Sequence, residues 1–210
     1  MIELELKYEI KKIPTALEKL KVIKKKEQED IYYDTPNYDL IRTGNFLRIR
    51  DKKRLEFKLF AGDTSHLYCQ ETDFELDKIT ENEEQINKIL SSLNLKKAKN
   101  LNSFKEIQDN NSLIILSPIK KHRTSYEYKE NSMISIDKVD DLGLFIEAEI
   151  MIDKDNITDS EASKIKEQFI NELKEEKILT GKEKSVNIGY VELYLLKHNV
   201  EAYELGIYKI

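Results

Sequence analysis

The chain begins with MIELELKYEI (residues 1–10), a stretch that alternates apolar and charged side chains. Successive side chains of a β-strand point to opposite faces of the sheet. One face of this predicted strand therefore carries the leucines, and the other carries Glu3, Glu5 and Lys7. In an ordinary half-exposed sheet the leucines would be buried and the charges would face water. Whether the charges instead face an interior depends on the other strands.

Composition sets the class of protein. The 210 residues are 40% hydrophobic and 36% charged, which is typical of one soluble globular domain over residues 1–210. A net charge of −5 gives no general basic field for duplex nucleic acid, and we see no apolar run long enough to span a membrane. Cys69 is the only cysteine, so a disulfide framework is excluded and a cytoplasmic location is expected. The three histidines match no zinc spacing.

Alternating segments predict eight strands, in an antiparallel sheet that is open or closed into a barrel. They are residues 2–10, 45–50, 54–60, 68–76, 113–119, 121–129, 133–138 and 144–152. Helices are predicted from Pro14 through Ile23, after the capping boxes at Thr80 and Thr158, and over residues 190–198. Turns are predicted at residues 34–37 and 140–143.

Most of the other predicted strands repeat the charged face of the first. The rows are Arg48 and Arg50; Glu56 and Lys58; Glu71 and Asp73; Lys121 and Arg123; Asp137; and Glu147 and Glu149. One interpretation is a sheet with these charges in water. The other is a closed barrel whose apolar rows lie beneath amphipathic helices and whose charged rows share one lumen. Clustered carboxylates suit Mg²⁺ or Mn²⁺, and clustered Lys and Arg suit phosphate oxygens. The second interpretation therefore predicts a site for a metal-bound polyphosphate.

Several stretches are similar to the CYTH family, the triphosphate tunnel metalloenzymes, which include class IV adenylyl cyclases and thiamine triphosphatases. The segment Glu3-x-Glu5-x-Lys7 resembles the ExExK signature of that family. The other stretches, in family order, are QEDIYYDTPNYDLIRTGNFLRIR (28–50), Glu56-Phe57-Lys58, Lys121-His122-Arg123, Asp137, LGLFIEAE (142–149) and the closing helix at 190–193.

The resemblance implies an α+β fold: an eight-stranded antiparallel closed barrel, a tunnel with a charged interior and helices packed outside. It implies that Glu3, Glu5, Glu147 and Glu149 hold Mg²⁺ or Mn²⁺, with Asp137 as a further ligand or a supporting group. The triphosphate would be bound by Lys7, Arg48, Arg50, Lys58, Lys121 and Arg123, with Lys184 as a further candidate. The catalytic set would be Glu3, Glu5, Lys7 and Asp137. Glu71 is expected to be a charge of the tunnel wall.

Three functions follow from this resemblance. The first is metal-dependent hydrolysis of a small-molecule triphosphate: inorganic tripolyphosphate, thiamine triphosphate or a nucleoside triphosphate. The second is conversion of ATP to cyclic AMP and pyrophosphate, and the third is polyphosphate or nucleotide binding without catalysis. The expected partner is the small molecule alone, with no duplex nucleic acid and no membrane, and the sequence leaves a homodimer open.

Overall fold

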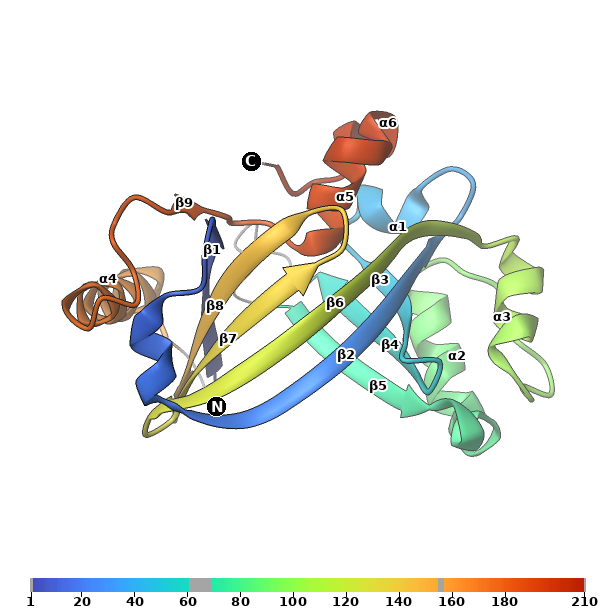
Figure 1. The fold of residues 1–210 in the computed structure, drawn as a ribbon. Coiled ribbons are helices and arrows are strands. Elements are labelled where there is room, and N and C mark those ends of the chain that lie inside the picture. Colours follow the sequence, from blue (N-terminus) through green and yellow to red (C-terminus); the bar gives the residue numbers. More distant parts are fainter. Residues whose placement is uncertain (1, 61–68, 155–156, 210) are drawn as a thin grey trace. The chain divides into compact units, whose positions relative to one another are not determined.

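A computed structural model describes residues 2–60, 69–154 and 157–209, with the side chains of 69 and 70 left out (Figure 1). The described chain is α+β, and its strands hydrogen-bond in the order β5-β4-β3-β2-β6-β7-β8-β1-β9, with antiparallel pairing in the registers described below. The strands are β1 Ile2–Ile10, β2 Lys21–Asp34, β3 Phe46–Arg50, β4 Arg54–Phe60, β5 Cys69–Glu75, β6 Ile114–Lys129, β7 Ser132–Val139, β8 Gly143–Ile152 and β9 Lys184–Ser185. Within the described residues this order ends at β5 and β9, so the predicted closed barrel is not confirmed.

Among the helices of the described residues, α4 is much longer than the others. The 3₁₀ helices are η1 Thr15–Lys19 and η3 Leu76–Asn82, and the α-helices are α1 Asp39–Arg42, α2 Glu83–Ser92, α3 Phe104–Asn111, α4 Asp159–Glu175, α5 Tyr190–His198 and α6 Val200–Leu205. None of the helices in the described ranges is long and apolar enough to cross a bilayer.

The chain divides into two compact units. The first contains residues 1–27, 121–187 and 210, and the second contains 28–120 and 188–209. One domain over residues 1–210 stays a prediction.

In the first unit, helix α4 covers the apolar face of the sheet. Leu6 of β1, Ile134 of β7 and Ile146 of β8 pack in one buried cluster with Phe169 and Leu173 of α4. Thr158 and Glu161 form the predicted capping box, each accepting a backbone N–H of the other, which begins α4 at the expected place. The apolar row of β1 is therefore buried beneath a helix.

In the second unit, helices α2 and α3 contribute to the apolar core on one side of β3 and β4 (Figure 1). Leu47, Ile49, Leu55 and Phe57 from the two strands pack with buried residues of these helices and their connections, among them Ile86, Leu90, Leu101 and Ile107. The charged rows of β3 and β4 fall on the opposite face, because side chains alternate along a strand.

Three local predictions were wrong. The helix predicted from Pro14 through Ile23 ends at Lys19 as the 3₁₀ helix η1, and residues 21–34 form strand β2, in which Val22-Ile23 is a β-branched pair that favours extended backbone. The two strands predicted over 113–129 are one long strand, β6. Thr80 caps no helix, because α2 begins at Glu83, whose side chain accepts the backbone N–H of Leu101 at 2.9 Å.

The predicted turn at 34–37 is organised by a buried carboxylate. Asp34 is fully buried, and its two oxygens accept the backbone N–H groups of Thr35 at 2.7 Å, Leu40 at 2.9 Å and Ile41 at 3.0 Å. Asp34 thus joins the end of β2 to the start of α1.

We expect Asp34→Ala to destabilise the protein by about 2–3 kcal/mol, because buried N–H donors lose their acceptor. Asp34→Asn is a smaller change at the same place. Its amide has one oxygen that can accept hydrogen bonds, whereas the two carboxylate oxygens of Asp34 accept three backbone N–H groups. A lower midpoint of urea unfolding for both variants is the expected result. A midpoint equal to that of the wild type would contradict the role.

Candidate functional site

The charged row of β1 lies opposite carboxylates of β8. The antiparallel register pairs Glu5 with Glu149 and Lys7 with Glu147, and directly opposite residues share one face of a sheet. Register between β7 and β8 pairs Ser135 with Glu147, which places Asp137 on that same face.

Three carboxylates of this face gather at one end of the row. Glu3, Glu5 and Glu149, which we call the acidic trio, have carboxylate oxygens within 4.8 Å of one another. Burial, together with the negative charges of Glu3 and Glu147, raises the pKa of Glu149 to about 7, although Arg123 opposes the shift. A cation placed among these oxygens would relieve the repulsion, and hard divalent ions prefer such ligands.

Beside the acidic trio lies a buried group of paired charges. Arg123 donates to Asp137 through Nε at 2.7 Å and Nη2 at 2.6 Å, and Lys121 donates to Asp137 at 2.9 Å. Asp137 is fully buried, and Arg123 also contacts Glu147. These four residues form what we call the Asp137 cluster. Charged groups this deeply buried require partners, and here they supply them to one another.

Lys7 connects the two groups. Its ammonium lies 2.9 Å from a Glu5 oxygen and 3.3 Å from a Glu147 oxygen. Burial alone would lower the pKa of Lys7, but the charges of Glu147 and Glu5 outweigh it and raise the pKa above its ordinary value. Lys7 is therefore held in its charged form between the acidic trio and the Asp137 cluster.

In the first unit, the predicted site residues thus fall into two adjacent groups, with Lys7 between them and Lys184 apart from both. The acidic trio contains three of the four glutamates predicted to hold metal. The fourth, Glu147, lies outside the trio and, like Asp137, contacts Arg123. Lys184 is exposed on β9, directly opposite Glu9, and belongs to neither group.

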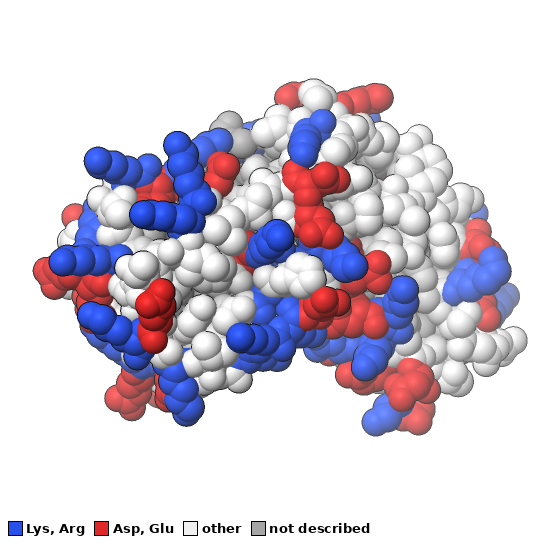
Figure 2. Space-filling model, viewed as in Figure 1, with Lys and Arg blue, Asp and Glu red and all other residues white. Residues whose placement is uncertain are grey.

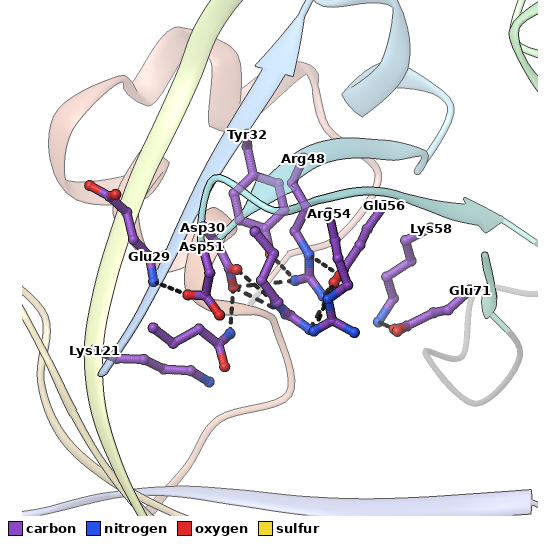
Figure 3. A network of polar contacts seen from close by, with 12 residues as sticks. Glu29, Asp30, Tyr32, Arg48, Asp51, Arg54, Glu56, Lys58, Glu71 and Lys121 are labelled. Atoms are coloured by element: carbon purple, nitrogen blue, oxygen red, sulfur yellow. Dashed lines mark hydrogen bonds and ion pairs between the residues drawn. The ribbon is translucent and has the colours of Figure 1, made fainter. Parts of the chain in front are cut away.

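The second unit holds its own network of ion pairs (Figure 3). Arg50 forms a two-pronged contact with Asp30, with distances of 2.8 and 3.1 Å. Arg48 donates to Glu56 through Nε at 2.8 Å and Nη2 at 2.6 Å, and to the Tyr32 hydroxyl at 2.7 Å. Arg50 also lies 3.2 Å from Glu56, so Glu56 is shared by both arginines. We call Asp30, Arg48, Arg50 and Glu56 the arginine network.

Lys58 and Glu71 form the outer part of the same face. Lys58 lies 3.2 Å from Glu71, across the β4–β5 pair (Figure 3). Burial would raise the pKa of Glu71, but Lys58 and Arg48 lower it below its ordinary value. Glu71 is therefore an ionised partner of Lys58.

Sequence reasoning missed Gln28, Asp30 and Tyr32, because residues 21–34 were not predicted to be a strand. Gln28 donates to Asp30 at 2.8 Å, and Asp30 is buried with its pKa lowered by Arg50 and Arg48 against the effect of burial. The alternation Gln28-x-Asp30-x-Tyr32-x-Asp34 is a period-two signal that could have revealed them.

Comparison with known proteins places the chain in a family. The model of the CYTH domain matches residues 1–185. A protein of Methanocaldococcus jannaschii named "Putative adenylate cyclase MJ0240" is 34% identical over 199 residues, covering 92% of this chain and 98% of that protein.

Solved structures show the same fold. The PH1819 protein of Pyrococcus horikoshii aligns with a TM-score of 0.61 and 24% identity, over 93% of this chain and 99% of that chain. The HpAC1 protein of Hippeastrum, whose structure is described as a putative adenylyl cyclase with a dominant triphosphatase activity, aligns with a TM-score of 0.61 and 17% identity, over 96% and 98%. By the family match and the archaeal relative, the chain belongs to the CYTH domain family.

Proposed function

We propose that this protein hydrolyses a small-molecule triphosphate with the help of a divalent metal ion. The observation that carries the proposal is the acidic trio lying beside buried cations on one face of the first unit, with Glu5 in contact with Lys7. A group of carboxylates alone could hold a structural metal ion, and a group of Lys and Arg side chains alone could bind any anion. The two together suit an ion bound to phosphate oxygens.

Each group of residues has a role in this proposal. Glu3, Glu5 and Glu149 would hold Mg²⁺ or Mn²⁺, which when bound supplies Lewis-acid polarisation and charge neutralisation at a phosphoryl group. Lys7, Lys121 and Arg123 would bind phosphate oxygens. Their contacts with Glu147 and Asp137 fix these cations before substrate arrives, and phosphoryl transfer depends mainly on such positioning. Asp137 would act by positioning Arg123 and Lys121.

We also retain Arg48, Arg50, Lys58 and Lys184 as proposed phosphate-binding residues, as the family resemblance implies. Arg48 and Arg50 present guanidinium groups, which can bind phosphate through two parallel hydrogen bonds. Their acidic partners, Asp30 and Glu56, would keep them charged and oriented until the substrate binds.

Cyclisation of ATP is the second candidate, favoured by the name of the Methanocaldococcus jannaschii relative. The description of the Hippeastrum protein supports hydrolysis instead. We rank hydrolysis first because water needs no dedicated pocket, whereas cyclisation requires the ribose hydroxyl to be placed against the α-phosphate.

A substrate panel tests the proposal. The purified protein is mixed with tripolyphosphate, thiamine triphosphate or ATP, with Mg²⁺, with Mn²⁺ or with a chelator, and the products are separated. We expect phosphate release that stops when the metal is chelated. Cyclic AMP and pyrophosphate from ATP would establish the cyclase instead. Tight binding of tripolyphosphate with no turnover of any substrate would reject both enzymes in favour of a binding protein.

Arg50→Ala is expected to raise KM for the triphosphate about tenfold or more while changing kcat less, because the lost contact binds the ground state as well as the transition state. Arg50→Lys is the matched variant, which keeps the charge and loses the two-pronged geometry, and it should fall between Ala and wild type. Steady-state kinetics on both variants measures this. Unchanged KM in Arg50→Ala would remove Arg50 from the substrate site.

A further inference from the structure

One edge of the first half of β2 carries backbone groups beside which the described ranges place no strand. Pairing of β2 with β3 covers only Asp30–Tyr33, and the other neighbour of β2 is β6. Contacts of Lys21 with Glu127 at 3.0 Å and of His122 with Glu27 at 3.4 Å hold the β6 side. Among the strands that the structure describes, none pairs with the second edge of residues 21–25. Such an edge is a template for an added strand.

The side chains along this edge are basic and apolar. Val22 is 44% exposed and Ile23 is 48% exposed, and Lys21, Lys24 and Lys25 are also exposed. Figure 2 shows basic side chains gathered where the first half of β2 runs in Figure 1. Because side chains alternate, Val22 and Lys24 share one face of the strand, whereas Lys21, Ile23 and Lys25 share the other. We call residues 21–25 the β2 edge.

We propose that the β2 edge binds an extended acidic peptide, of a partner protein, that adds to the sheet as a strand. A peptide in which acidic and apolar residues are interleaved would place carboxylates against the lysines and apolar groups against Val22 and Ile23. Its backbone would meet the unpaired N–H and C=O groups, which supply affinity, while the side chains supply specificity. Opposite charges facing each other across strands stabilise the pair.

Two other occupants fit the same edge less well. A second copy of this chain would set lysines against lysines, which is unfavourable when like charges lie opposite each other. A flat anionic membrane could meet Val22 or Ile23 but not both, because the two side chains point to opposite faces of the strand. A peptide strand lies alongside both faces.

The test uses a fluorescent peptide of about nine residues, a usual strand length, in which Glu and Val alternate. Fluorescence anisotropy with the full-length protein should show binding that weakens as salt is added. Hydrogen exchange should show new protection of backbone amides within residues 21–27. The double variant Lys24→Glu/Lys25→Glu should lose about tenfold or more in affinity and should gain affinity for a Lys–Val peptide.

Matched controls separate strand addition from simple charge attraction. The variant Lys97→Glu/Lys99→Glu changes net charge equally at exposed positions outside the edge and should bind the acidic peptide as wild type does. A peptide of the same composition with a central proline should bind weakly, because proline lacks the N–H that the ladder needs. Equal binding of the proline peptide, equal binding by Lys24→Glu/Lys25→Glu, or binding to phosphatidylserine vesicles without peptide binding would overturn the proposal. Triphosphate turnover is not a readout, so failure here leaves the proposed enzyme activity untouched.

Discussion

Replacing Glu149 with glutamine is expected to lower triphosphate turnover by about 100-fold or more at saturating metal. Glu149 supplies one of the oxygens of the acidic trio, and even residues that only support metal ligands cost 10–100-fold when changed. Phosphate release measured at increasing Mg²⁺ concentrations checks this, since a weakened metal site should need more metal to reach half-maximal rate.

The same variant should keep its fold. Because the pKa of Glu149 in the folded protein is about 7, above its ordinary value of 4.5, the ionised carboxylate opposes folding in the metal-free protein. The free energy of unfolding of the wild type should therefore fall as pH rises from 4.5 to about 7. In Glu149→Gln this contribution to the pH dependence should be absent. Urea unfolding of metal-free protein at several pH values measures it.

Glu9→Gln is the matched control, because Glu9 is an exposed carboxylate of the same strand β1 outside the trio. It should keep wild-type turnover. If Glu149→Gln also kept wild-type turnover, Glu149 would have no part in the metal site.

Leu6→Glu should destabilise the protein by about 4 kcal/mol or more, the second large effect we expect. Leu6 is 9% exposed and packs in the apolar cluster with Phe169 and Leu173 of α4. A carboxylate placed there must be desolvated or protonated, and either is costly. Loss of soluble protein, or a much lower unfolding midpoint, is the measurement.

Leu6→Met separates the charge from the change of shape, because a swap that conserves volume usually costs less than about 1.5 kcal/mol. We expect Leu6→Met to express and unfold nearly as wild type does. Equal stability of Leu6→Glu and Leu6→Met would mean that the apolar row of β1 faces water.

The sequence predicted the faces of the strands better than their extents. Alternation in β1 and β8 correctly separated Leu6 and Ile146, which lie beneath α4, from Glu5 and Glu149, which meet across the strand pair. Alternation is a local property of the backbone, so it can be read from one segment at a time. Predicting that Glu149 lies beside Glu3 and Glu5 also requires the register between β1 and β8. That register depends on both strands and cannot be read from either one alone.

The errors lie where partners decide the structure. Leu17, Leu20 and Ile23 recur at helical spacing, but the 3₁₀ helix η1 ends at Lys19 and residues 21–34 join the sheet beside β6 as strand β2. That error concealed Asp30, so the carboxylate that holds Arg50 in a two-pronged contact was missing from the prediction, whereas Glu56 was placed among the charged rows. Glu83 likewise fitted a capping box but serves the N–H of Leu101, a partner far away in sequence.

Strand β1 has a consequence for how the protein can change over time. Its apolar row packs beneath α4 and its charged row lies among the ionic groups, and the two rows alternate residue by residue. Loss or gain of a single residue between Glu3 and Lys7 would move every later side chain of the strand to the opposite face. Charged side chains would then lie beneath α4, and apolar side chains would lie among the ionic groups. A substitution changes one side chain on one face, whereas a change of length by one residue alters both faces together.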